Sequence, residues 1–434
     1  MPKGKKKGKF EHRRTEQPCS SDEDAGIDMT IDNCSETSAQ SDLKSNHEEA
    51  ENEVQEKLED KVLELIEALG ARAAAARAAA LVALRGALQR RHLEPVLAGR
   101  RATLADHVAR ALRRGRDPER RAAAALAPIL ALQIGDEGTE EFMKEVRPAL
   151  VAVCTDKSAS LDTRTECCSS LAVLCYLLEE DISEILEILR MYETIFSGSY
   201  LKGDGSVKVS AAVVAEGGWH AAALDGWALL LAALEPRHAR ALLHDRAPGA
   251  ARLAGLLDAA SLEVRMAAGG ALAIAHERVT ETEEEPAAGA GWPDAGGDLL
   301  QRLEQLARDP HKYRAKRDRK LQRATFRDIL KYFEEGEVPS LRVRVGAEAV
   351  ECASWAARGA YGALAAALGA GLRPLLAHCG ELRAALGLPA AQPLAAPGCK
   401  LNKLQRHLQN SAANKARTVA RNKNRDKRSA ALAI

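Results

Sequence analysis

The stretch RAAALVAL at residues 77–84 decides the fold class, because it returns in altered form further along the chain. RRAAAALAPIL begins at Arg120 and RTECCSSLAVL at Arg164, which places the opening arginines 43 and 44 residues apart. EVRMAAGGALAIA, which contains Arg265, and WHAAALDGWALLLAAL, which begins at Trp219, have the same character. Intervals of this length are typical of HEAT and armadillo repeats, which stack because one unit cannot bury its apolar face alone. The sequence therefore predicts an all-α fold, an armadillo/HEAT-like α-solenoid.

The composition agrees with that fold class. Aromatic residues make up only 3% of the 434 residues, whereas alanine is abundant and favours helices. The clearest strand pattern is LRVRVG at Leu341–Gly346, which is too short to found a sheet. The Gly-, Pro- and acid-rich stretch that follows Glu283 predicts an exposed loop between helices.

Composition changes along the chain predict three regions. Residues 1–55 are rich in charged and small polar side chains, which predicts a disordered tail, basic and then acidic. Residues 56–335 form the helical repeat domain, and residues 336–434 form a C-terminal domain that ends in a basic helix at about 400–430. Ser20 and Ser21 each have an acid three residues on, a weak pattern for an acidophilic kinase; the alternative is a merely solvated tail.

Several function classes have no support in the sequence. No run of eighteen apolar residues and no signal peptide is present, so we expect no membrane partner and a cytoplasmic and nuclear location. Nine cysteines without CxxC spacing predict reduced core residues, and His220 lies in an apolar helical run, where a core histidine is commoner than a metal ligand. No catalytic, nucleotide-binding or metal-binding motif survives its context requirement, which predicts a non-enzymatic protein without cofactor or metal.

Positive charge gathers at the C-terminal end of a chain whose formal net charge is only +1. Lys400 to Arg428 contains ten Lys and Arg residues against one acid, Asp426. On a helix, the cations of one stripe are predicted to contact phosphates: Lys403, Arg406, Arg417, Arg421, Arg425 and Arg428. The opposite stripe is predicted to dock on protein: Leu401, Leu404 and Leu408. A nuclear localisation signal or a solvated helix are the alternatives.

A second basic cluster lies at residues 311–327, HKYRAKRDRKLQRATFR. Its cations share one helical face and are predicted to bind nucleic acid: Lys312, Lys316, Lys320, Arg323 and Arg327. Leu321, Phe326 and Ile329 are expected to face the core. Alone, this cluster could equally be a solvated ridge, but two clusters in one near-neutral chain favour nucleic-acid contact.

The order of these segments resembles the interferon-related developmental regulator family. The resemblance rests on RATLADHVARALRRGRDPERRAAAALA from Arg101, EVRMAAGGALA from Glu263, HKYRAKRDRKLQRATFRDIL from His311 and NSAANKARTVARNKNRDKR from Asn410. It implies an armadillo-type fold and a regulator of gene expression, with members linked to transcriptional co-regulation and to ribosome binding with translational repression. We therefore expect a scaffold whose basic C-terminal helix binds structured RNA, with the ribosome as partner. The alternative is a nuclear co-regulator whose solenoid binds transcription factors or co-repressors.

Overall fold

The structure of the chain, a computed structural model, describes residues 55–199, 211–245, 249–281, 296–308, 316–345 and 348–390. The predicted N-terminal tail with Ser20 and Ser21, and the predicted C-terminal basic helix, lie outside these residues.

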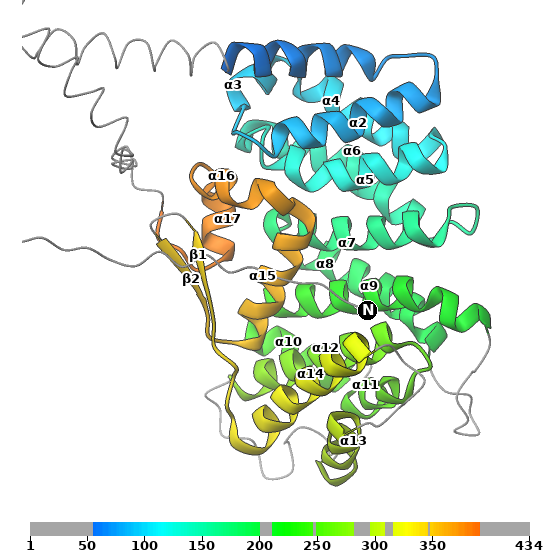
Figure 1. Cartoon of the computed structure of the whole chain (residues 1–434), viewed down its shortest axis with the longest axis vertical. Helices are drawn as coiled ribbons and strands as arrows, with labels where there is room; N and C mark the ends of the chain where they lie inside the picture. The colour runs from blue at the N-terminus through cyan, green and yellow to red at the C-terminus, as the bar shows by residue number, and fades with distance from the viewer. Residues whose placement is uncertain are drawn as a thin grey trace, which may run out of the picture. The chain divides into compact units, whose positions relative to one another are not determined.

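Five long helices pack side by side in a front row, in the order of the chain (Figure 1). Each coincides with one of the five repeat units that the sequence predicted, which confirms the all-α solenoid. A helical segment at residues 55–68 precedes the row and buries Leu58, Val62 and Ile66. The front row consists of α2 (Ala74–Leu88), α5 (Asp117–Ala131), α7 (Leu161–Leu178), α9 (Ala211–Ala233) and α12 (Leu262–Thr280).

Four further helices form a second row behind the first. α4 packs on α5, α6 on α7, α8 on α9 and α10 on α12, so four of the five front-row helices have a second-row partner. The second row consists of α4 (Arg101–Arg114), α6 (Asp136–Thr155), α8 (Ile182–Phe196) and α10 (Pro236–Asp245). Brief connecting helices are α3 (Glu94–Leu97), η1 (Ala98–Arg100), η2 (Ser197–Ser199), α11 (Ala250–Gly255) and η3 (Leu256–Asp258).

The abundant alanines have a packing role in the front row. Ala122, Ala123, Ala124 and Ala127 of α5 are all buried, although they point in different directions around the helix. A front-row helix is covered by its two neighbours and by the second row, so it must be apolar nearly all round. Small side chains allow these helices to approach closely.

Two of the repeated arginines, Arg77 and Arg265, clamp the turn that precedes their own front-row helix. Arg265 Nη1 donates to the carbonyl oxygens of Ala259 and Ala260 at 2.6 and 3.3 Å. Arg77 Nη1 makes the same contacts five and six residues back, to Ala71 and Arg72, at 2.8 and 2.9 Å. Arg77 also forms a two-pronged ion pair with Glu119 of α5. Arg77 therefore ties a turn to its own helix and to the next repeat, whereas Arg120, 43 residues on, pairs with Asp156.

After α12 the chain forms a helix pair, a hairpin and a returning segment. α13 packs on α14, and α14 packs on α12. The strand pattern at residue 341 forms β1, and the expectation that it is too short for a sheet was wrong, because it pairs with an antiparallel partner, with Val343 opposite Val350. These elements are α13 (Gly296–Arg308), α14 (Lys316–Glu335), β1 (Leu341–Val345), β2 (Glu348–Cys352), α15 (Trp355–Leu368), η4 (Gly369–Gly371), α16 (Leu372–Leu376) and α17 (Gly380–Ala385).

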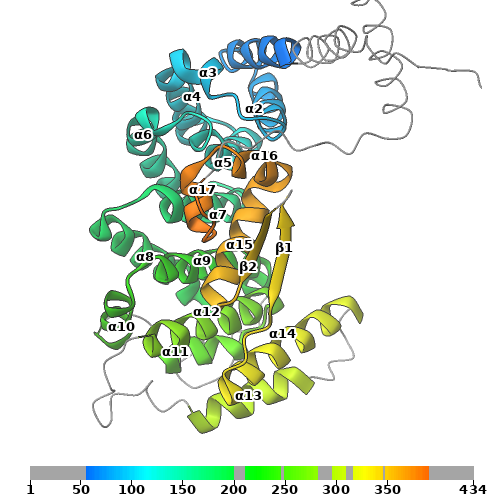
Figure 2. The ribbon, with the colours of Figure 1, turned by 90° about the vertical axis from the view of Figure 1, so that its left-hand side faces the viewer.

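Residues 355–390, here called the return segment, run back along the front row from α12 towards α2 (Figures 1 and 2). At the start, the carboxylate of Glu277 in α12 accepts the backbone N–H groups of Trp355 and Ala356 at 2.9 and 2.8 Å. At the far end of α15, Arg85 of α2 and Gln89, which directly follows α2, donate to the carbonyl oxygens of Ala367 and Leu368 at 2.9 and 3.0 Å. The return segment thus connects the last repeat to the first.

One hydrophobic core extends from Leu58 to Leu386 and includes residues on both sides of the predicted boundary at 335 and 336. The six described cysteines are free and buried, as predicted for reduced core residues. His220 is a core histidine, also as predicted, and its Nδ1 lies 2.7 Å from the Ser199 hydroxyl. No helix in the described ranges combines the length and the apolar character that crossing a membrane requires.

Candidate nucleic-acid interface

Helix α14 carries the second basic cluster, and its opposite face anchors it to the solenoid. Gln322, Phe326, Ile329 and Tyr332 are buried, at the helical spacing of one face. Gly269 of α12 permits this close approach, because a Cβ there would lie 2.7 Å from Ile329 Cδ1 and 2.9 Å from Phe326 Cε1. The packing therefore fixes which face of α14 turns to solvent.

A polar contact sets the position of α14 along α12. Gln322 is 2% exposed, and its side-chain oxygen accepts from Arg265 Nη2 at 3.4 Å. The Gln322 amide nitrogen donates to the carbonyl oxygen of Leu306 in α13 at 3.4 Å. One repeat arginine thus orients the helix that bears the basic face.

Four of the five predicted cations lie on the free side of this helix. Lys316, Lys320 and Arg327 are exposed, and Arg323 is half-buried with its Nε donating to the carbonyl oxygen of Arg319 at 3.2 Å. We call these four residues the α14 ridge. They extend about 16 Å along the helix at 1.5 Å per residue. Lys312 lies outside the described residues, as do all the predicted tail residues from Leu401 to Arg428.

The α14 ridge is not neutralised within the described chain. None of its four cations has a described carboxylate within ion-pair distance, whereas Lys331, one turn further on, lies 2.5 Å from Glu337 and is paired. Helical geometry places the aspartates of α14, Asp318 and Asp328, away from the ridge. Exposed unpaired cations on a rigid helix can bind phosphates by charge and hydrogen bonds.

Two details differ from the sequence-based expectation. Leu321 was expected to face the core, but its side chain is 57% exposed, because the buried face is set by Gln322, Phe326 and Ile329. Arg317 is a further exposed cation, which lies outside the predicted stripe because it does not share its helical spacing of three and four residues. The exposure of each residue next to the ridge depends on the orientation of α14 about its own axis where it packs on Gly269. No local sequence pattern predicts that orientation.

Nothing in the described ranges forms a group of three or more His, Cys, Asp or Glu side chains that could hold a metal ion.

Comparisons with known proteins identify the family. The family model described as Interferon-related developmental regulator matches residues 30–334, and the one described as Interferon-related protein conserved region matches residues 385–429. Interferon-related developmental regulator 2 of Mus musculus is 36% identical over 367 residues, which cover 84% of this chain and 81% of that protein. Interferon-related developmental regulator 1 is 36% identical in Mus musculus and 34% in Homo sapiens, each alignment covering 96% of this chain and 91% of the relative. The repeat solenoid, the basic helix that follows it and these matches over most of the chain have one explanation: the protein belongs to the interferon-related developmental regulator family.

Proposed function

We propose that this protein is a non-enzymatic regulator of gene expression that binds structured RNA on the ribosome and represses translation by occupying its site. The α14 ridge is one anchor, and the basic C-terminal segment from Lys403 to Arg428 is the other. The observation that carries the proposal is the exposure of Lys316, Lys320 and Arg327 without a carboxylate partner in the described chain. The phosphates of RNA are negatively charged and can serve as the partners of these cations.

The competing function is nuclear co-regulation through protein binding on the solenoid. A solenoid commonly binds partners along an open face. Here α15 packs against α5, α7, α9 and α12, so part of the front row is already covered by the chain itself. This contact favours the RNA-binding function over one in which the whole front row receives a transcription factor.

The first test measures binding to purified ribosomes at several salt concentrations. The triple variant Lys316→Glu, Lys320→Glu and Arg327→Glu removes the exposed part of the ridge. Each lost phosphate contact should reduce the slope of log affinity against log salt by about 0.7, so the triple variant should lose about 2 from the slope. A chain that ends at Gly398 separately removes the tail anchor. We expect neither variant to sediment with ribosomes in a sucrose gradient at moderate salt.

A matched control distinguishes the loss of a specific binding site from the effect of a change in net charge. Arg72, Arg90 and Arg114 are exposed, and none has a described ion-pair partner, so Arg72→Glu, Arg90→Glu and Arg114→Glu change the charge equally. This control should bind like the unmodified chain. Equal loss in both triple variants, or a slope near −1 for the unmodified chain, would contradict the proposal. Loss of nuclear entry with unchanged ribosome binding would favour the co-regulator instead.

A further inference from the structure

The β-hairpin has an open backbone edge along β1. Among the described residues, its sheet consists of two antiparallel strands, β1 and β2. β2 also packs on α15, whereas β1 packs chiefly on β2 (Figures 1 and 2). In an antiparallel pair, alternate residues of a strand direct their N–H and C=O groups away from the partner strand. No other described element forms a backbone hydrogen bond with β1, so this edge can accept a further strand.

The apolar face of the hairpin is only partly covered on the β1 side. Val350 and Cys352 of β2 are buried, at 1% and 2% exposure. Leu341, Val343 and Val345 of β1 lie on the same face and are half-buried. A strand added beside β1 would cover the remaining apolar surface of these three side chains. We therefore expect apolar residues at every second position of such a strand.

The opposite face of the hairpin is positively charged. Arg342 and Arg344 are both exposed on it. Arg342 Nε lies 3.2 Å from a carboxylate oxygen of Glu351 on β2, and both side chains of this pair are exposed. Arg344 lies opposite Ala349, and no described carboxylate is within ion-pair distance of it. Acidic side chains on an added strand would lie directly opposite these arginines, an arrangement that stabilises neighbouring strands.

The same arginines disfavour a second copy of this chain as the added strand. If two β1 strands paired antiparallel about Val343, Arg342 of each copy would lie opposite Arg344 of the other. Like charges in directly opposite positions are destabilising. A shift of one residue would relieve the repulsion only by turning the apolar side chains to the other face. Charged residues on an edge strand thus oppose self-association and leave the edge open to a strand of opposite charge.

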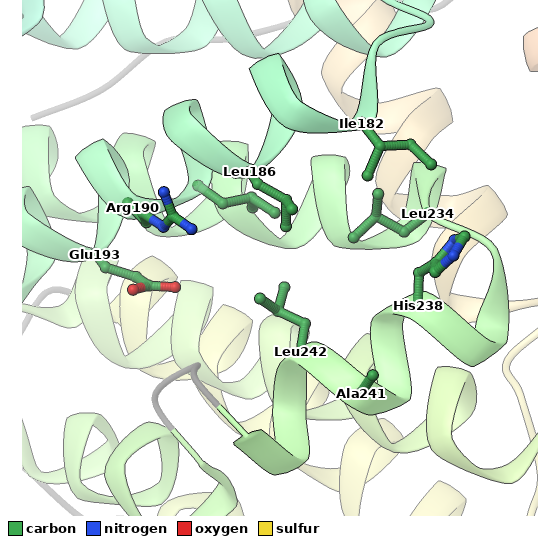
Figure 3. A pocket seen from close by; sticks show the side chains of 9 residues that line it. Ile182, Leu186, Arg190, Glu193, Leu234, His238, Ala241 and Leu242 are labelled. Atoms are coloured by element: carbon green, nitrogen blue, oxygen red, sulfur yellow. The ribbon is translucent and has the colours of Figure 1, made fainter.

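The groove between α8 and α10 is a second open surface, but its lining indicates no class of partner. Its volume is about 300 Å³, and Leu186 and Leu242 belong to its apolar lining (Figure 3). Arg190 and Glu193 contribute charges of opposite sign, and His238 faces it from α10. The β1 edge differs because it combines open backbone groups with positive charge.

We propose that the free edge of β1 binds an extended acidic segment of a partner protein as a third strand. Main-chain hydrogen bonds with β1 provide affinity, as in other cases of strand addition. Apolar residues of the segment cover the half-buried face of β1, and its acids lie opposite Arg342 and Arg344 and provide specificity. The edge shares no residue with the α14 ridge, so strand addition and ribosome binding can be measured separately.

The test uses the full chain and three labelled peptides of about nine residues, in which valine alternates with a charged residue. The first contains glutamate and the second contains lysine. The third is the glutamate peptide with N-methyl groups on its backbone nitrogens, which keeps the charge but cannot donate hydrogen bonds to a strand. Because the basic C-terminal segment can attract any acidic peptide, the third peptide measures that background. Fluorescence anisotropy should show saturable binding of the glutamate peptide, at least about tenfold tighter than binding of the other two.

One variant and hydrogen exchange locate the binding site. Arg344→Glu should weaken binding of the glutamate peptide by about fivefold and strengthen binding of the lysine peptide. Arg72→Glu makes the same change of charge at an exposed arginine before α2, and it should leave both affinities unchanged. On binding of the glutamate peptide, amides of β1 that face the open edge should exchange more slowly, while amides in the middle of α5 should not change.

Four results would overturn the proposal. The glutamate peptide could fail to bind saturably, or its N-methylated form could bind equally well. The amides of β1 could remain unprotected in the complex. Sedimentation velocity could show self-association of the chain that the glutamate peptide reverses, because the edge would then receive a second copy. Circular dichroism melts of both variants establish that the fold is retained.

Discussion

At the scale of single residues, the repeat arginines show how much of a role a spacing can predict. The intervals between Arg77, Arg120 and Arg164 predicted the repeats, and the helices begin where those intervals indicated. The intervals did not predict what each arginine touches. Arg265 reaches Gln322, which is 57 residues away, and Arg77 reaches Glu119, 42 residues away. Such partners are decided by stacking of the units, which brings together residues without any local relation.

Arg265 should therefore be important for stability as well as for the position of α14. It is 6% exposed, and Arg265→Met would leave the carbonyl oxygens of Ala259 and Ala260 without their charged donor. We expect the free energy of unfolding in urea to fall by about 2 kcal/mol. Arg317→Met, a change of the same kind at an exposed position, should have little effect. Similar urea midpoints of unfolding for the two variants would show that the contacts of Arg265 with Ala259 and Ala260 contribute nothing to stability.

At the scale of elements, helix α15 is fixed by capping from a distant part of the chain. Its first turn leaves backbone N–H groups without partners inside the helix. Ser354 accepts the N–H of Ala357 at 3.0 Å, a local cap that the sequence contains. Glu277 of α12 accepts the N–H groups of Trp355 and Ala356, and this cap spans 78 residues of sequence. A sequence pattern can mark the first kind of cap but not the second.

The Glu277 cap gives a prediction about the docking of α15. Glu277 is 7% exposed, and burial raises the pKa of its carboxyl group, while the two N–H bonds partly offset that effect. Glu277→Ala removes both acceptors and should lower the free energy of unfolding by about 2 kcal/mol. Glu277→Gln keeps one acceptor and loses the buried charge, so its cost should be smaller.

Hydrogen exchange of the backbone amides shows which part of the chain is destabilised by Glu277→Ala. In Glu277→Ala, the amides of Trp355 and Ala356 should exchange faster, while amides in the middle of α5 should change only with global stability. Unchanged protection at Trp355 and Ala356 would contradict the cap. Glu281→Ala is a suitable control, since Glu281 lies one turn further along, is partly exposed and pairs with Arg278.

At the scale of the whole described chain, the fold class was predictable from the sequence. The packing of the return segment on the front row was not. Helical period and repeat interval are local signals, so they predicted the solenoid. The return segment reads along the sequence only as another alanine-rich helix, YGALAAALGAGL from Tyr361. Its position on the front row depends on shape complementarity with four helices, which no local pattern contains. The cations of the α14 ridge were predictable because they share one helix.

The return segment should be part of the folding unit rather than an appendage. It buries Leu364, Leu368, Leu372, Leu375 and Leu376 against the common core. At about 1.5–3 kcal/mol for each buried leucine, the five contribute on the order of 10 kcal/mol, which is comparable to the whole stability of an ordinary domain. A chain that ends at Glu335 should therefore lose its cooperative thermal transition and bind a hydrophobic dye.

Two further chains make that prediction specific. A chain that ends at Gly398 keeps the return segment and should unfold at the temperature of the full chain. The full-length double variant Leu364→Asp and Leu368→Asp keeps every residue but places charges where α15 meets the front row, so it should behave like the chain that ends at Glu335. If the chain that ends at Glu335 instead melted cooperatively at the full-length temperature, the solenoid would be stable alone. The return segment would then be a cover, and its removal would expose the front row as a binding face.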